Sequence, residues 1–395
     1  MKIASYQFNR LEFSGSLGDL GTLIPLSLAL IIICQLSATT VFLMIGIFYL
    51  SCGFFYKLPI PVQPLKVVSA IAIAFPAKIT LPVLAASGLT FGVILLLLSL
   101  TGLINWIAKF FSKPIVRGIQ LGLGLILISK GIGFVLKPEL LIEQTGVINS
   151  FWGISANLLL GIIGGIVTLI LISNKRFPAA LIIVIGGLMV GLFTRSLSVM
   201  DFNFGPTPIQ LYIPSFNDFS IALIFLVIPQ VPLTLGNAVI GTVDTCQSLF
   251  KKEEATKKVT NINLSLSMGI INIITGFLGG MPMCHGAGGL AAHYRFGART
   301  GGSNLMIGTV FLVIALGFGS IGLVLFSSIP NAVLGILLLF AGLELAVLIR
   351  DIKEKNDLFI TILIAGIGFV TTNMGIAFFI GIIVTHLIKW KKVVL

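Results

Sequence analysis

Charged residues are scarce in this chain, and most of those present are positive. Only 10% of the 395 residues are charged, with 13 acids against 25 lysines and arginines, while hydrophobic residues reach 57% and the mean hydropathy is +1.12. Soluble domains contain about 25% charged residues. A water-soluble fold is therefore excluded, and we expect an all-helical protein that crosses a membrane many times, with about 20 residues per crossing.

Cysteine and histidine are also rare, with four and three residues. Cys34, Cys52, Cys246 and Cys284 stand singly in apolar segments, without the pair spacing of a disulfide or a zinc site. We therefore expect no metal and no cofactor. The first ten residues are short and polar, and the first apolar run lacks a small-residue cleavage site, so no removed signal peptide is expected.

Apolar runs between short polar breaks predict fourteen membrane spans. The first seven cover 14–34, 37–56, 63–76, 81–103, 114–136, 152–173 and 178–195. The second seven cover 219–243, 259–279, 284–297, 301–326, 329–349, 357–371 and 373–390. Spans 63–76 and 284–297 are too short to cross a bilayer alone and are expected to be half-helices with extended lead-ins.

The positions of the basic residues support this topology. With fourteen spans, nearly all of them fall on one side; only Lys78, Lys137 and Arg195 fall on the other, and Lys66 and Lys130 lie within spans. Because basic loops stay in the cytoplasm, we expect a cell-membrane protein with both termini cytoplasmic.

Seven spans in each half imply opposite orientations for the two halves. Since seven is odd, the second half enters the membrane from the other side. The units 11–195 and 216–392 are therefore predicted to be inverted repeats, an architecture common among secondary transporters.

Two stretches interrupt the apolar pattern with prolines and glycines, one in each half: 57–66 and 280–297. Unpaired backbone at membrane depth is tolerated only inside the protein or beside a water-filled cavity. Each stretch leads into a short helix whose first turn offers free N–H groups and partial positive charge. Two such helix starts meeting at the midplane would bind an oxyanion. Helix packing is the alternative explanation of these prolines and glycines.

Polar side chains beside these helix starts are candidate ligands. Gln63 and His285 can both donate to an oxyanion, although His285 could equally bond a backbone carbonyl. Gln230, Thr234 and Asn237 are spaced by four and three residues and would share one helix face; their alternative role is to join helices. The expected substrate contacts are Gln63, Pro64, Gln230, Thr234, Asn237, Cys284, His285, Gly286 and Gly288.

Ionisable residues within the spans form a second group of candidates. They are Asp19, Glu344 and Lys66, with Asp244 nearer the cytoplasmic edge. Such residues are costly in a membrane and indicate ion or proton sites. Asp19 could instead cap a helix or pair with Lys66. A carboxylate beside an anion repels it unless protonated, so coupling to H+ is a further expectation.

Taken together, these motifs resemble the molybdate transporter family, distant relatives of the SulP sulfate permeases. The resemblance spans nearly the whole chain and is carried by 18–25, 61–66, 230–237 and above all 281–301. It implies a UraA/SulP-like fold with a core of spans 1–4 and 8–11, a gate of spans 5–7 and 12–14, and substrate between spans 3 and 10. SulP permeases usually add a cytoplasmic STAS domain, which we do not expect here.

The function predicted on this basis is import of an oxyanion, preferably molybdate, by a secondary transporter working through alternating access. Tungstate, sulfate or another oxyanion is the alternative substrate, and a homodimer in the lipid bilayer is a further expectation. A nucleobase carrier is disfavoured because the sequence places no acid at either half-helix start. An enzyme using Cys284 and His285 is disfavoured because neighbouring helix residues point about 100° apart. A channel is disfavoured because the sequence lacks the continuous polarity that would line a pore. No nucleic-acid role is expected.

Overall fold

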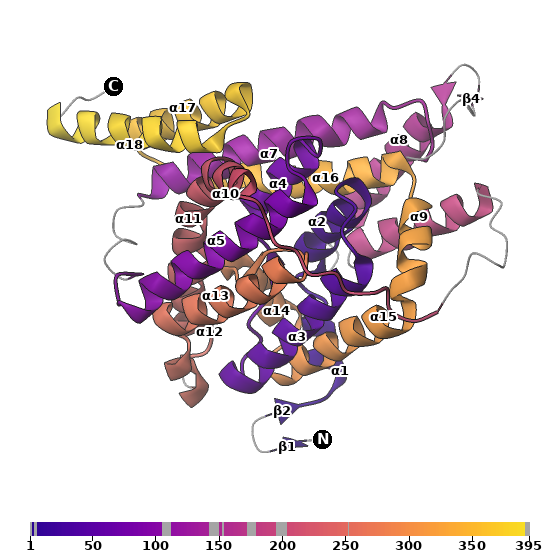
Figure 1. Ribbon diagram of the computed structural model, residues 1–395, viewed down its shortest axis with the longest axis horizontal. Coiled ribbons are helices and arrows are strands. Elements are labelled where there is room, and N and C mark those ends of the chain that lie inside the picture. The colour runs from indigo at the N-terminus through magenta and orange to yellow at the C-terminus, as the bar shows by residue number, and fades with distance from the viewer. Residues whose placement is uncertain are drawn as a thin grey trace.

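The structure is a computed structural model, and it describes residues 2–3, 6–104, 112–141, 150–151, 154–171, 179–194, 204–251 and 253–391. Helices dominate it (Figure 1). Those of the first half are α1 (Arg10–Ser16), α2 (Leu20–Ile33), α3 (Ala38–Tyr56), α4 (Lys66–Ala74), α5 (Leu81–Leu100), α7 (Lys113–Val135), α8 (Ala156–Leu171) and α9 (Ala179–Thr194).

The second half repeats the alternation of long and short helices. Its helices are α10 (Phe216–Ala222), α11 (Ile228–Leu233), α12 (Gly241–Leu249), α13 (Asn261–Phe277), α14 (Ala287–Phe296), α15 (Gly302–Ser327), α16 (Asn331–Ala346), α17 (Lys355–Thr371) and α18 (Met374–Lys391). The strand pairs are β1 (Lys2–Ile3) with β2 (Tyr6–Gln7), β3 (Gln63–Pro64) with β6 (Met283–Cys284), and β4 (Ser150–Phe151) with β5 (Ile154–Ser155).

The predicted helical membrane fold is confirmed, and every predicted span overlaps a helix. By length and apolar composition, six helices in the described ranges can cross a membrane, or seven when the bent pair α1–α2 counts as one span. Fourteen crossings therefore stay a prediction. Arg195, residue 392 and the outer ends of the predicted spans 152–173 and 178–195 lie outside the described residues.

The first predicted span is bent rather than straight, with α1 and α2 meeting at 46°. Its glycines allow α14 to approach the bend closely. A Cβ atom on Gly18 would lie 2.8 Å from the carbonyl oxygen of Ala292. The bend leaves Asp19 at the start of α2, where its side chain points to the centre of the protein and does not cap the helix.

The eighth predicted span is longer than 219–243 and is irregular inside. Its helical segment runs over Phe216–Leu249 and contains two π-helical turns, Leu223–Val227 and Thr234–Ile240. Pro232 lies between them and lacks the N–H that a regular helix would use. Such π-helical turns often occur at functional sites.

The long helices pack in pairs that join the two halves of the chain. α3 packs on α15, and α5 packs on α13, so that each pair takes one helix from each half. α7 packs on α16, and glycines face each other there: a Cβ on Gly131 would lie 2.6 Å from the carbonyl oxygen of Gly335, and the reverse also holds. Small residues at these contacts permit the close approach that membrane helices use to associate.

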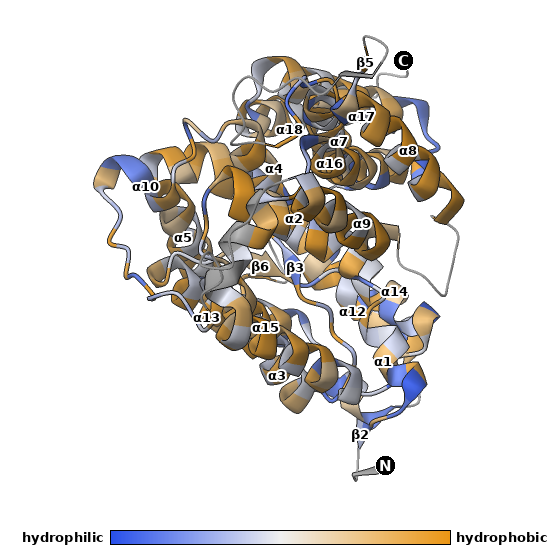
Figure 2. Cartoon of the chain, turned by 90° about the vertical axis from the view of Figure 1, so that its right-hand side faces the viewer, coloured by the Kyte–Doolittle hydropathy of each residue, from blue (hydrophilic) through white to orange (hydrophobic). Residues whose placement is uncertain are grey.

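The two interrupted stretches meet in the middle of the protein. Figure 2 shows β3 and β6 between one group of helices containing α7, α16, α17 and α18 and another containing α3, α13 and α15. β3 and β6 pair antiparallel, Gln63 opposite Cys284 and Pro64 opposite Met283. The half-helices predicted at spans 3 and 10, with extended lead-ins, are thereby confirmed as α4 and α14.

Candidate functional site

Two short helices begin side by side at the β3–β6 crossover. α4 follows Leu65 and α14 follows Gly286, and neither helix has a hydrogen bond from the side chain of its N-cap residue. The amide of Leu65 donates to the carbonyl oxygen of Pro282 at 2.9 Å, which ties the start of α4 to the other stretch. The first turn of α14 therefore presents free N–H groups and the positive end of a helix dipole.

A cavity of about 410 Å³ opens in front of these helix starts. One wall comes from α2, the crossover and α14, and the other from α7 and α16. Its lining includes side chains of both charges. The lining residues are Gly18, Asp19, Gly21, Thr22, Leu26, Gln63, Lys66, Arg117, Leu127, Asn237, Ala287, Gly288, Gly289, Ala292, Ala341, Glu344, Leu345 and Leu348.

Gln63 and Asp19 form a buried pair at the base of the cavity. The Gln63 amide nitrogen donates to both carboxylate oxygens of Asp19, at 2.8 and 2.9 Å, while the two residues are only 1% and 4% exposed. The Gln63 amide oxygen has no hydrogen-bond partner in the described structure. An unpartnered buried polar atom is rare in folded proteins and often marks a functional position.

Glycine in α14 makes room for this pair. A Cβ atom on Gly289 would lie 2.5 Å from Asp19 Oδ2 and 2.7 Å from Gln63 Nε2, and one on Gly286 would collide with the Gln63 amide oxygen. A Cβ on Gly288 would meet no atom within 4 Å. Gly289 is thus needed for close packing against the pair, whereas Gly288 faces open space in the cavity.

Asp19 places an acid at both helix starts, which corrects one step of the sequence analysis. The absence of an acid at these positions was the reason for disfavouring a nucleobase carrier, and that reason is wrong. The bend between α1 and α2 brings Asp19 there from a distant part of the sequence. Asp19 accepts from Gln63 and does not form a salt bridge with Lys66.

Basic residues flank the cavity from opposite walls. Lys66, at the start of α4, is partly buried and makes no salt bridge with a described residue. Arg117, on α7, donates from Nε to Oδ1 of Asp351 at 3.0 Å and from Nη2 to Oδ2 at 2.6 Å. The Lys66 ammonium group is therefore not held in a salt bridge by a described residue, while the Arg117 guanidinium is held by the Asp351 carboxylate.

Gln230 and Thr234 lie outside the cavity lining, in contrast to Asn237. Gln230 accepts from the amide of Val67 at 2.8 Å and donates to Thr234 Oγ1 at 2.9 Å, so both side chains are buried and satisfied. A π-helical turn has more residues per turn than an α-helix. It begins at Thr234, and Asn237 is thereby turned away from the other two side chains toward the cavity.

His285 also lies outside the lining and is bonded at both ring nitrogens. Nδ1 is 2.9 Å from the carbonyl oxygen of Pro61, and Nε2 is 2.9 Å from Ser267 Oγ. Because a carbonyl only accepts, Nδ1 donates to Pro61, and Nε2 shares a hydrogen bond with the Ser267 hydroxyl. The ring thus joins the lead-in of α4 to α13.

The remaining predicted contacts are next to the cavity without lining it. Cys284 is buried and its thiol donates to the carbonyl oxygen of Pro64 at 3.6 Å, while Gly286 packs on Gln63. Asp244 is exposed on α12. Of the expected substrate contacts, Gln63, Asn237 and Gly288 line the cavity, as do Asp19, Lys66 and Glu344 of the ionisable group.

Sequence reasoning did not select several lining residues. Ala287 and Ala292 belong to the interrupted stretch already noted, as does Gly289, one of the glycines of that stretch expected to let a ligand approach the backbone. Thr22 lies one helical turn after Asp19, and this spacing could have identified Thr22 as a lining residue. Arg117 was read only as a topology charge, since nothing local distinguishes it from other basic residues.

We expect His285→Ala to destabilise the protein without removing its ligand site. The change removes the ring donor of the Pro61 carbonyl and one of the partners of the Ser267 hydroxyl, which keeps Tyr56 and the Leu264 carbonyl, and it opens a small void. Together these losses cost about 2–4 kcal/mol. Thermal unfolding in detergent measures this, with His386→Ala as the control because His386 is exposed on α18. Affinity for an oxyanion that binds in the cavity should stay within about threefold. Lost affinity at unchanged stability would make His285 a ligand instead.

Comparison with known proteins places this geometry in a class. The fold is shared with the transmembrane domain of a cyanobacterium bicarbonate transporter, BicA (TM-score 0.66, 17% identity, covering 93% of this chain and 97% of that one). It is also shared with the murine anion transporter Slc26a9 in its inward-facing state (TM-score 0.71, 18% identity, covering 99% of this chain and 70% of that one). The chain thus has the UraA-like fold of these membrane proteins.

Sequence relationships define the family within that class. The family model described as "Molybdate transporter of MFS superfamily" matches residues 11–127 and 222–345. Molybdate transporter 2 of Arabidopsis thaliana is 33% identical, covering 96% of this chain and 87% of that protein; Molybdate transporter 1 of Chlamydomonas reinhardtii is 28% identical, covering 94% and 90%. The chain belongs to the molybdate transporter family, which confirms the resemblance and a transporter rather than an enzyme.

Proposed function

We propose that the chain imports molybdate and holds it in the cavity in front of α4 and α14. The observation that carries this proposal is the uncapped first turn of α14, whose residues Ala287, Gly288 and Gly289 all line that cavity. A tetrahedral dianion accepts several hydrogen bonds at once, and a helix N-terminus supplies them together with positive potential. Lys66 and the Asn237 amide add donors from other sides.

The available hydrogen-bond donors favour an anion over a nucleobase despite the presence of Asp19. Asp19 already accepts two hydrogen bonds from Gln63, whereas the Lys66 ammonium has no described ion-pair partner. The names of the relatives support molybdate as the oxyanion. Sulfate and tungstate are the alternative substrates, because they have the same shape and charge and would use the same donors.

We further propose that transport works by alternating access between a core and a gate. The core would comprise spans 1–4 and 8–11, and the gate spans 5–7 and 12–14. The cavity lies between these groups: Gln63 and α14 form one wall, while Arg117 and Glu344 project from α7 and α16 on the other. A relative movement of the two walls would carry the anion across while the β3–β6 crossover stays intact.

Proton coupling is proposed from the acids in the same cavity. Asp19 and Glu344 both line the space that the dianion would enter. Bringing a dianion next to two carboxylates is unfavourable unless a proton enters with it. The cell membrane, with both termini in the cytoplasm, is the proposed location, because basic residues concentrate on that side.

Uptake by purified protein in liposomes tests these proposals. We expect accumulation of radiolabelled molybdate, faster when the outside is more acidic than the lumen, and weaker uptake of labelled sulfate. Protein-free liposomes and Gln63→Ala protein are the controls. No accumulation of either anion would contradict the transport proposal, and uptake unaffected by the pH gradient would contradict proton coupling alone.

A further inference from the structure

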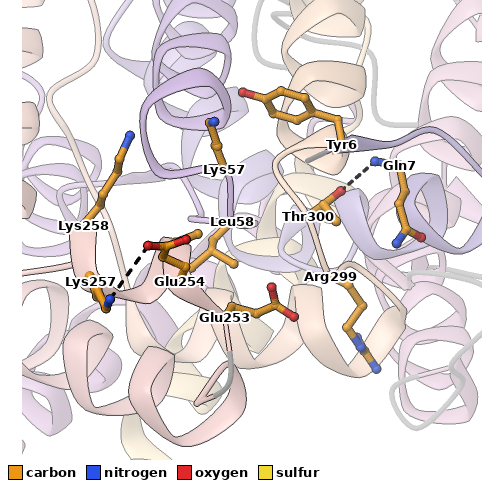
Figure 3. Close-up of a pocket in the computed structure, with 11 residues that line it drawn as sticks. Tyr6, Gln7, Lys57, Leu58, Glu253, Glu254, Lys257, Lys258, Arg299 and Thr300 are labelled. Atoms are coloured by element: carbon orange, nitrogen blue, oxygen red, sulfur yellow. Dashed lines mark hydrogen bonds and ion pairs between the residues drawn. The ribbon is translucent and has the colours of Figure 1, made fainter. Parts of the chain in front are cut away.

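A second cavity, of about 650 Å³, lies at the end of α3 and is built from four separate segments (Figure 3). It shares no lining residue with the anion cavity. Its lining residues are Tyr6, Gln7, Lys57, Leu58, Glu253, Glu254, Ala255, Lys257, Lys258, Arg299 and Thr300. The proposed topology puts this end of α3 at the cytoplasmic surface of the membrane, where phospholipid headgroups lie.

Among the described residues that line this second cavity, Lys57 and Lys258 are basic side chains without an ion-pair partner. Lys257 pairs with Glu254 at 3.8 Å, and Arg299 donates to backbone carbonyls and stacks on Tyr294. Lys57 forms no side-chain hydrogen bond or ion pair with a described residue, and Lys258 donates only to the carbonyl oxygen of Phe55. In Figure 3 the ammonium groups of Lys57 and Lys258 extend in the same direction, away from Arg299.

An apolar groove of about 360 Å³ lies next to this cavity, since Phe55 and Tyr56 line the groove and Lys57 and Leu58 line the cavity. It lies between α3 and α13 and is lined by Ile47, Phe48, Ser51, Cys52, Phe55, Tyr56, Asn263, Leu266, Ser267, Ile270, Ile271 and Ile274. Phe55 joins the two features, because its ring lines the groove while Lys258 lies 5.3 Å from the ring centroid. Ile47 and Ile270 are 38% and 53% exposed in the groove.

We propose that the cavity and the groove together bind one anionic phospholipid. The phosphate group would lie between Lys57 and Lys258, and an acyl chain would occupy the groove between α3 and α13. Basic pockets between helices on the cytoplasmic side suit anionic headgroups. An apolar groove next to such a pocket suits the attached chain, because burying each methylene is favourable. A soluble anion would use only the first of these two features.

The groove is linked to the anion site through a short chain of hydrogen bonds. Tyr56 and Ser267 both line the groove, and their hydroxyls are 3.0 Å apart. Ser267 in turn contacts His285, which bonds Pro61 in the lead-in of α4. A lipid in the groove would shield these hydroxyls from water, and we expect it to raise the thermal stability of the protein.

Binding of a fluorescent phosphatidylglycerol to the full chain in neutral detergent tests the headgroup site, with phosphatidylcholine as the neutral comparison. We expect clear preference for phosphatidylglycerol and about 30-fold weaker binding by Lys57→Gln/Lys258→Gln. Lys353→Gln/Lys355→Gln, which removes two exposed lysines elsewhere, stays within about twofold. Equal affinity for both lipids, or equal loss in both double variants, would overturn the proposal.

Two further arms test the groove and the identity of the ligand. Ile270→Trp fills the groove at an exposed position and should weaken lipid binding, whereas Leu97→Trp, on the exposed face of α5, should not. Inorganic phosphate at millimolar concentration should compete poorly. Phosphate that displaces the lipid fully and stabilises the protein alone would assign the site to a soluble anion. A changed oligomeric state of Ile270→Trp with unchanged lipid affinity would assign the groove to a second copy; either result overturns the proposal.

Discussion

Gly289→Ala is expected to weaken molybdate binding by about tenfold or more in a protein that still folds. The added methyl group would lie 2.5 Å from Asp19 Oδ2 and 2.7 Å from Gln63 Nε2, so the Gln63–Asp19 pair must move. Overpacking of this kind costs about 1–3 kcal/mol, and here the strain falls on the binding site. Equilibrium binding of labelled molybdate to purified protein measures the effect.

Gly288→Ala is the matched control for this prediction. It makes the same chemical change one residue earlier, where the new methyl group meets no atom within 4 Å. The backbone N–H that we propose as a donor is retained. We expect the Gly288→Ala variant to keep most of the affinity for molybdate. Equal losses at both positions would show that the cavity tolerates no added volume and would refute the specific role of the Gln63–Asp19 pair.

Lys66→Gln is the second change with a large expected effect. The ammonium group of Lys66 lines the cavity without a described ion-pair partner, so it can donate to the dianion directly. A hydrogen bond to a charged group contributes about 1.5–3 kcal/mol, and its loss weakens binding by about 30-fold. Lys66→Arg keeps the positive charge and should recover part of the affinity in the same binding assay.

Lys130→Gln is the control for the charge itself. Lys130 is also a partly buried lysine of a membrane helix, but its ammonium group lies 5.2 Å from the ring centroid of Phe75 and outside the cavity lining. Molybdate affinity should change by less than about threefold. If Lys66→Gln and Lys130→Gln behave alike, Lys66 is not a ligand, and general positive potential attracts the anion.

The interrupted helices could be predicted from sequence because their signals are local. Proline and glycine restrict or free the backbone wherever they occur, so 57–66 and 280–297 stood out from a uniformly apolar chain. The expectation that the two helix starts meet did not extend to the antiparallel pairing of β3 with β6, which only the structure shows. The helices of the fold were also predictable from a local signal, because each apolar run extends over a whole span.

The partners of individual side chains could not be predicted, because they depend on distant segments. Asp19 reaches Gln63 only through the bend between α1 and α2. Gln230, in the second half of the chain, accepts a hydrogen bond from the Val67 amide of α4, in the first half. The regular spacing of Gln230 and Asn237 suggested one shared face. The π-helical turn that separates them has no sequence signal beyond the nearby prolines.

Locating bound molybdate by electron cryomicroscopy of the full chain in nanodiscs tests the central proposal most directly. We predict a strong density peak within hydrogen-bond distance of the backbone amides of Ala287–Gly289, on the side of the cavity that Lys66 lines. A peak elsewhere, such as between Lys57 and Lys258, with none in front of α14, would contradict the assignment of the β3–β6 crossover as the oxyanion site.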